Sequence, residues 1–171
     1  MDNLTRIEYG AFLSTFLRGV VIDGLAKLEH MSFYAFSNVV RRDDQVLRIR
    51  GSFPELDKIQ GGAFQNAITV NNATRNEIIF RDLPKLRLVD SDAFKDVIQP
   101  LAGPGLGEKY NGRFVFEGHF PALGSISNGA FALCPIHSSD SADFGFTCSN
   151  STKIAATSAM IPEDVARVKF P

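Results

Sequence analysis

The stretch Leu56-Asp57-Lys58-Ile59-Gln60-Gly61-Gly62-Ala63-Phe64 decides the fold, because four other segments of the chain repeat its pattern. Each copy has a Leu, an aliphatic residue three positions later, and an Ala-Phe dipeptide four positions after that. The frame is therefore Leu-x-x-(Ile/Val/Met)-x-x-x-Ala-Phe. The dipeptides are Ala11-Phe12, Ala35-Phe36, Ala63-Phe64, Ala93-Phe94 and Ala130-Phe131. Self-similarity of this kind is the signature of a repeat architecture.

A short run of β-prone residues precedes each frame after the first. These runs are 20–22, 46–49, 78–80 and 114–116. Alternation of apolar and charged residues, as in Leu47-Arg48-Ile49-Arg50, is typical of a strand with one buried face. Each repeat therefore predicts a strand, a turn and a second short strand.

The segments that connect the repeats grow along the chain, whereas the frame stays constant. Successive Ala-Phe pairs are separated by 24, 28, 30 and 37 residues. A polar insertion at 71–76 and a Gly- and Pro-rich one at 100–111 indicate loops that leave a regular body. Beyond Phe131 the pattern weakens, although Phe144-Gly145-Phe146 is typical of a further strand and 154–161 of a degraded frame.

Stacking of the units is the physical reason to expect a solenoid. One unit cannot bury its apolar side alone, but stacked units place equivalent residues above one another and build a continuous core. We expect a mainly β solenoid of short parallel strands with little helix, and a ladder of Phe rings along one edge. Residues 1–133 are predicted to form about five coils and 134–171 an atypical terminal repeat or cap, all in a single domain.

Two details of the residue usage add to this picture. With fifteen Phe, three Tyr and no Trp, the aromatic rings are expected to fill the core. The residue before the Ala is Gly in three copies but Tyr34 and Asp92 in the others, so a positive φ there is not expected in every copy.

The combination of Leu47-x-Ile49 with Leu56-x-x-Ile59-x-x-x-Ala63-Phe64 resembles leucine-rich repeats. It is most similar to the divergent repeats of BspA-like surface proteins and glycoprotein hormone receptor ectodomains, in which Ile-x-x-x-Ala-Phe closes each coil. The resemblance covers residues 4 to about 131 and implies an extracellular or cell-surface binding role. It carries over no ligand-contact residue. The Asn that follows the Leu-x-x-Leu-x-Leu core in most leucine-rich repeats has no fixed counterpart here, so an irregular right-handed β-helix remains the alternative coil.

Two further features favour an extracellular setting. Asn-x-Ser/Thr acceptor sequences for glycosylation occur at Asn3, Asn72 and Asn150. Cys134 and Cys148 enclose thirteen residues, a spacing that a disulfide can close. Two buried thiols are the alternative for this pair.

Composition argues against several classes of partner. The formal net charge of −1 gives no basic surplus for nucleic acid. No stretch approaches the length of about 20 apolar residues that a membrane-spanning helix needs, and the first residues lack the apolar run of a secretory signal. The chain begins directly with a repeat, so its first coil is expected to be uncapped and to offer a surface for self-association.

Motifs for enzymatic chemistry are not found in the sequence. It has no phosphate-binding glycine loop, nucleophile elbow or His-Glu-x-x-His, and the three His are far apart. No cofactor and no metal site is predicted. Carboxylates of the kind that β-helical polysaccharide enzymes use would be Asp82, Asp90, Asp92 and Glu117. Asp90 and Asp92 lie inside the frame, at positions where residue type varies between copies, and variable polar positions in a repeat are typical of solvent-facing sites.

The sequence therefore predicts a binding module for a protein or glycan ligand, engaged through a sheet face or the inserted loops. Arg48, Arg50 and Arg113 lie in or beside the predicted strands and are the candidate contact residues. A structural or adhesive spacer is the second hypothesis, and a carbohydrate-active β-helix enzyme the third.

Overall fold

The repeats form β-strands throughout. The computed structural model describes residues 3–15, 17–69, 75–99, 113–132, 144–148 and 153–154, and none of these ranges contains a helix. The strands are β1 (Arg6–Ile7), β2 (Gly19–Asp23), β3 (His30–Met31), β4 (Val46–Arg50), β5 (Lys58–Ile59), β6 (Ile68–Thr69), β7 (Glu77–Arg81), β8 (Leu88–Val89), β9 (Ile98–Gln99), β10 (Arg113–Phe120), β11 (Ser125–Ile126), β12 (Phe144–Cys148) and β13 (Lys153–Ile154).

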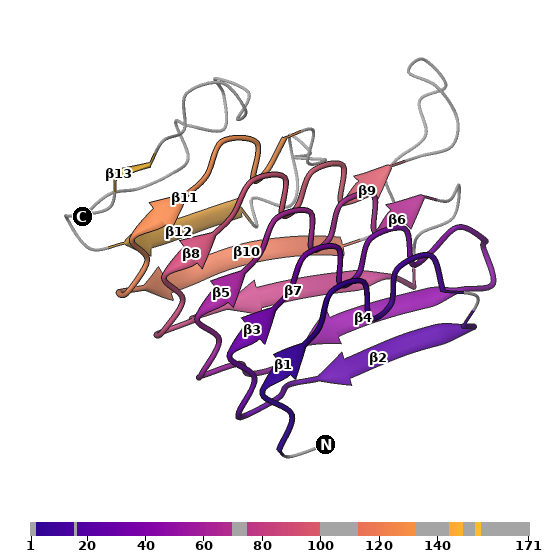
Figure 1. The fold of residues 1–171 in the computed structure, drawn as a ribbon, viewed down its shortest axis with the longest axis horizontal. Helices are drawn as coiled ribbons and strands as arrows, with labels where there is room; N and C mark the ends of the chain where they lie inside the picture. The colour runs from indigo at the N-terminus through magenta and orange to yellow at the C-terminus, as the bar shows by residue number, and fades with distance from the viewer. Residues whose placement is uncertain are drawn as a thin grey trace.

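Two parallel sheets contain most of these strands (Figure 1). The short-strand sheet has the order β1-β3-β5-β8-β11-β13, and the long-strand sheet has the order β12-β10-β7-β4-β2. A third, two-stranded sheet pairs β6 with β9. Strand order follows chain order in both large sheets, so each pass of the chain lays one strand beside its predecessor in each sheet. The predicted mainly β architecture of parallel strands is confirmed.

The register repeats from pass to pass. In the short-strand sheet, Ile7 pairs with Met31, Met31 with Ile59, Ile59 with Val89, and Val89 with Ile126. These are the aliphatic residues of the frame, and all of them are buried. The segment after Phe131 contributes β12 and β13, which continue both sheets. Ile154 lies in register with Ile126 there, as the degraded frame predicted.

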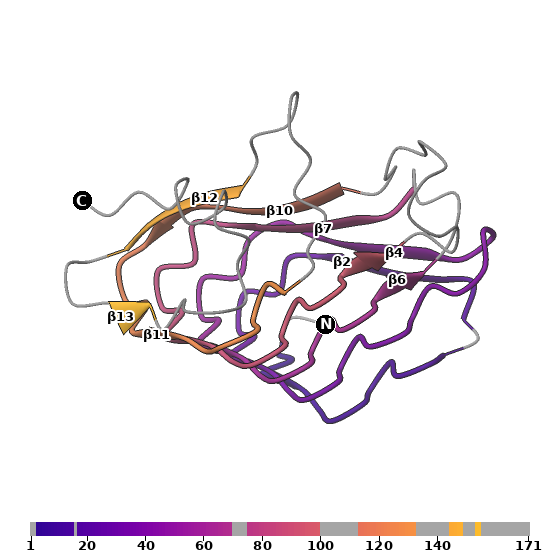
Figure 2. The same cartoon turned by 90° about the horizontal axis from the view of Figure 1, so that it is seen from above.

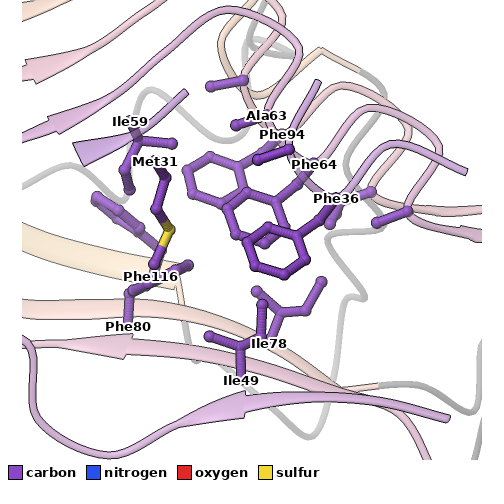
Figure 3. Packing of buried hydrophobic residues seen from close by; sticks show 14 of the residues in the cluster. Met31, Phe36, Ile49, Ile59, Ala63, Phe64, Ile78, Phe80, Phe94 and Phe116 are labelled. Atoms are coloured by element: carbon purple, nitrogen blue, oxygen red, sulfur yellow. The ribbon is translucent and has the colours of Figure 1, made fainter. Parts of the chain in front are cut away.

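The two sheets face each other as separate layers, with the core between them (Figure 2). The inward residues of the long strands, such as Leu47, Ile49 and Phe80, are fully buried. They meet the frame residues of the short-strand sheet, such as Met31 and Ile59 (Figure 3). Within the described ranges no helix is long and apolar enough to cross a membrane.

The Ala-Phe dipeptides build the expected ladder of rings (Figure 3). Phe12, Phe36, Phe64, Phe94 and Phe131 stack in sequence with centroid separations of 5.1, 5.0, 5.2 and 5.2 Å and interplanar angles of 13° or less. Stacked pairs of this kind contribute about 0.5–1.5 kcal/mol each beyond their burial. Successive turns approach closely at the small Ala, because the N–H of each of the first four Phe residues donates to the Ala carbonyl of the next turn at 2.7–2.8 Å.

Buried polar side chains hydrogen bond to backbone groups at the start of two long strands. The Asn76 Oδ1 atom accepts the Leu47 N–H at 2.7 Å. Gln45 accepts the Arg41 N–H and donates to the Thr15 and Leu17 carbonyls. These contacts join neighbouring turns where regular pairing stops, which satisfies backbone groups that would otherwise be buried without a partner.

Candidate ligand-binding face

A left-handed backbone residue turns the chain after each short strand. The residue before the frame Ala has a positive φ in all five copies, with values of 55–77° at Gly10, Tyr34, Gly62, Asp92 and Gly129. The residue types at Tyr34 and Asp92 do not demand this conformation, yet both residues adopt it. The turn demands it, because the N–H of this residue bonds to the neighbouring turn in at least three copies: Gly10 to Phe33, Tyr34 to Gly61 and Gly62 to Ser91. Tyr34 and Asp92 adopt it despite their side chains, a cost usually avoided by Gly.

Three aromatic rings gather at this turn in the first two repeats. Tyr9, Phe33 and Tyr34 are 67%, 41% and 39% exposed. Tyr9 and Tyr34 meet edge to face with ring centroids 6.0 Å apart. We call these three residues the aromatic corner. Phe33 is the exception to the expectation that Phe fills the core.

Two glycines of the third repeat seat the rings. A Cβ atom on Gly62 would lie 2.6 Å from Tyr34 Cε1, and one on Gly61 would lie 3.1 Å from Phe33 Cε1. Any side chain at Gly62 would therefore displace the Tyr34 ring. The glycines let the rings lie against the backbone of the next turn, while Phe33 and Tyr34 stay 41% and 39% exposed.

A groove of about 360 Å³ lies at the opposite end of the short strands. It runs across several repeats, because its lining comes from Glu29, His30, Glu55, Asp57, Pro84, Lys85, Arg87 and Ala122. All of these residues except His30 precede a short strand, whereas the aromatic corner follows one. The outward side chains of β1, β3 and β5 lie between the two features: Arg6, His30 and Lys58.

The charges in the groove are paired with one another. Arg87 forms a bidentate pair with Asp57, in which Nη2 donates to Oδ2 at 2.7 Å. Lys85 donates a hydrogen bond to Glu55. The Arg87 hydrogen bond is the main reason that the pKa of Asp57 is lowered, with Lys58 and His30 adding to it against the opposing effect of burial. Asp57 in turn raises the pKa of Arg87. His30 Nε2 lies 3.9 Å from Glu29 Oε2.

Arg48 and Arg50, two of the predicted contact residues, lie on the outer face of the long-strand sheet, away from the corner. Arg48 and Arg113 both pair in register with Glu77, one from each neighbouring strand. Arg50 binds Asp23 through its Nε at 2.6 Å and lies 3.6 Å from Glu77, and the Asp23 hydrogen bond raises its pKa. Arg48 donates to the Arg75 carbonyl at 2.9 Å. The fold thus brings these positions together but surrounds them with acidic partners. The Arg113 side chain lies outside the described residues.

The modification sites are placed only in part. Asn3 is exposed and accepts a hydrogen bond from Lys27 Nζ at 2.7 Å. Asn72, Asn150 and Cys134 lie outside the described residues. The Cys148 backbone, in β12, pairs with Phe120 of β10. The disulfide between Cys134 and Cys148 stays a prediction.

The carboxylates considered for catalysis have structural partners. Asp82 accepts the His119 N–H at 2.8 Å, which ties β10 to the turn after β7. Asp90 accepts from Ser91 N–H and Ser127 Oγ, and Asp92 lies 3.7 Å from Lys95 Nζ. The Glu117 backbone pairs with Arg81. Among the described residues, no three His, Cys, Asp or Glu side chains gather in a way that would hold a metal ion.

Sequence reasoning missed the aromatic corner, although a signal for it exists. The position of Phe33 is occupied by Gly61 and Ser91 in later repeats, and that of Tyr34 by Gly62 and Asp92. Large aromatic residues at positions that other copies fill with small or polar ones are not needed by the core. No family model, curated protein or solved structure matches the chain.

Proposed function

We propose that this chain is part of a right-handed solenoid, with leucine-rich-repeat or β-helical coils, that acts as an extracellular or cell-surface binding module. Strand order that follows chain order in both sheets supports the solenoid. The exposed position of Asn3, within an Asn-x-Thr sequence, supports an extracellular setting, because a glycan needs an accessible acceptor.

The aromatic corner is the observation that carries the binding role. Exposed aromatic side chains that lie together are unusual on a surface without a partner, and Tyr is enriched among the residues that dominate binding energy. Polar residues border the corner, with exposed Glu8 on one side and half-buried Asp92 on the other. An apolar centre with a polar rim is the usual anatomy of a binding surface.

The other two hypotheses have less support. A spacer would present polar faces throughout, which leaves the aromatic corner unexplained. A polysaccharide enzyme needs carboxylates that converge on a substrate, whereas Asp82, Asp90 and Asp92 stabilise turns. We also favour the corner over the predicted Arg residues as the contact surface, because Arg50 already forms ion pairs with Asp23 and Glu77.

A binding array with matched variants tests this proposal. The array carries purified extracellular proteins and defined oligosaccharides, and the labelled chain is applied as wild type and as the double variant Tyr9→Ser/Phe33→Ser. The control is Leu17→Ser/Val21→Ser, which removes two side chains of similar exposure (52% and 57%) away from the corner. We expect binding by wild type and control and loss in the corner variant. Equal binding by all three, or none by wild type, contradicts the proposal.

A further inference from the structure

The aromatic corner and the groove lie at the two ends of the same short strands, on the outer face of one sheet. Each strand is two residues long, and about four residues separate Glu29 at the groove from Phe33 at the corner. With a rise of about 3.3 Å per residue and about 4.8 Å between neighbouring strands, the two features are roughly 15 Å apart. A single small molecule does not span that distance, but a short chain of linked units does.

We propose that the corner and the groove form one binding face for a short, neutral oligosaccharide. This inference rests on the proposed binding function and names its ligand class. The corner holds one end of the oligosaccharide by stacking, and the groove holds the other by hydrogen bonds.

Stacking at the corner follows from the way the rings are held. The C–H groups on one side of a pyranose are apolar and carry partial positive charge, so they pack on the electron-rich face of an aromatic ring. Contact of Phe33 and Tyr34 with Gly61 and Gly62 fixes the rings before the ligand arrives, which limits the entropy lost on binding. The hydroxyl group of Tyr9, the most exposed of the three rings, remains able to hydrogen bond.

The groove favours a ligand without negative charge because both of its permanent cations are already paired and its carboxylates outnumber them. It contains three carboxylates, two permanent cations and one His. Arg87 and Lys85 are bonded to Asp57 and Glu55, so a phosphate or carboxylate would have to compete with the carboxylate that each cation already binds. Paired carboxylates retain oxygen lone pairs that accept from sugar hydroxyls, and Lys and Arg retain N–H donors.

A protein partner fits this face less well. Protein interfaces need a broad apolar centre from which water is excluded, and they bury about 800 Å² on each side. The exposed apolar part here is small, consisting of the three rings and Leu13 beside Gly10. The surface between corner and groove is formed by Arg6, His30 and Lys58. A small apolar site flanked by polar contacts matches a carbohydrate.

Tyrosine fluorescence gives a direct readout of binding at the corner. The chain has no Trp and three Tyr, of which Tyr9 and Tyr34 belong to the corner. In a Tyr110→Phe background, every emission change reports those two residues. Neutral hexose and N-acetylhexosamine oligomers, from disaccharide to hexasaccharide, are titrated with this protein. We expect a saturable change with affinity that rises with oligomer length and levels off once the groove is reached.

Two variants separate the ends of the face. Phe33→Ser should weaken every oligomer by about tenfold or more. Lys85→Gln, at an exposed groove position, should weaken the longer oligomers and leave the disaccharide unchanged. Leu17→Ser serves as the control. Failure of all oligomers to bind, or binding that ignores Phe33→Ser, overturns the oligosaccharide inference. If the array described above shows corner-dependent binding to proteins alone, the inference falls while the proposed function stands.

Discussion

Gly10 and Gly62 occupy the same left-handed position in two repeats but differ in the space around them. A Cβ on Gly10 meets Leu13 at 3.4 Å, an ordinary contact, whereas on Gly62 it would lie 2.6 Å from Tyr34. Gly10→Ala therefore measures the backbone cost alone, about 1 kcal/mol. Gly62→Ala adds a clash, and we expect a total loss of about 2–3 kcal/mol in the free energy of unfolding. Urea denaturation of both variants checks the difference, and equal losses would contradict it.

Asp96 is the acidic residue among four equivalent left-handed positions. Ser14, Asn38, Asn66 and Asp96 all have positive φ, four residues after the first left-handed position of each turn. Asn tolerates this conformation well. Burial raises the pKa of Asp96 above its usual 3.8, an effect that Lys95 opposes and Asp92 adds to.

Asp96→Asn should therefore stabilise the protein slightly at neutral pH, by at most about 0.5 kcal/mol, because solvent screens this partly exposed carboxyl group. An acid whose pKa is raised on folding binds its proton more tightly when folded. Its contribution to stability is present below pH 3.8 and is lost as pH rises through the folded pKa. The variant should lack that part of the pH dependence. Thermal denaturation from pH 3 to pH 8 follows it, and a variant less stable than wild type at pH 7 would refute the argument.

At this scale the sequence predicts burial better than backbone conformation. The frame positions were predictable because every copy has the same residue type, as with Leu28, Leu56 and Leu86, all fully buried. The positive φ at Tyr34 and Asp92 was not, because the local residue disfavours it and the neighbouring turn imposes it. Exposure of Phe33 likewise depends on which turn lies beside it.

The ladder of Phe rings is the element that most directly joins one repeat to the next. Phe64 is fully buried and stacks on both sides, whereas Phe12 has a single stacked neighbour and is only partly buried. Phe64→Ala should cost about 3–5 kcal/mol, and Phe12→Ala clearly less. If Phe64→Ala fails to fold, Phe64→Leu at about 1–1.5 kcal/mol keeps the comparison possible. Chemical denaturation of the pair measures it, and a larger loss at Phe12 would contradict the stacking account.

Strands were predictable as elements because two signals agree, namely alternation in the long strands and the aliphatic residue in the short ones. Their partners followed from the repeat. The ion pairs between repeats were not predicted, because residue type varies at their positions. Asp57 and Arg87 each follow the frame Leu of consecutive repeats. The frame fixes which positions meet, and the groove depends on the charges that stand there.

The molecule as a whole is a linear array, in which each repeat contacts its neighbours. Interior strands β4 and β7 are paired on both sides, whereas β2 pairs with β4 alone among the described strands. Stability in such arrays is a sum of local and nearest-neighbour terms, so opening should begin at β2. Hydrogen exchange should be slowest at Leu47, Ile49 and Ile78 and faster across β2. Uniform protection of the three strands would show that the array unfolds only as one unit.

The general architecture was predictable at this scale, but the placement of the binding face was not. Stacking of repeats follows from the frame, whatever the identity of the variable residues. The proposed face combines Tyr9 from one repeat, Phe33 from the next and Gly61 from a third. Its position depends on how far consecutive turns are offset, which a single repeat does not encode.

The spacing of the ladder of Phe rings is insensitive to the length of chain between successive rings. Centroids stay 5.0–5.2 Å apart although the intervening chain grows from 24 to 37 residues. The longest insertions follow β6 and β9, outside the frame itself. A foreign peptide spliced between Thr69 and Arg75, or between Gln99 and Arg113, should therefore be displayed without disturbing the array, which makes this protein a scaffold for grafted epitopes.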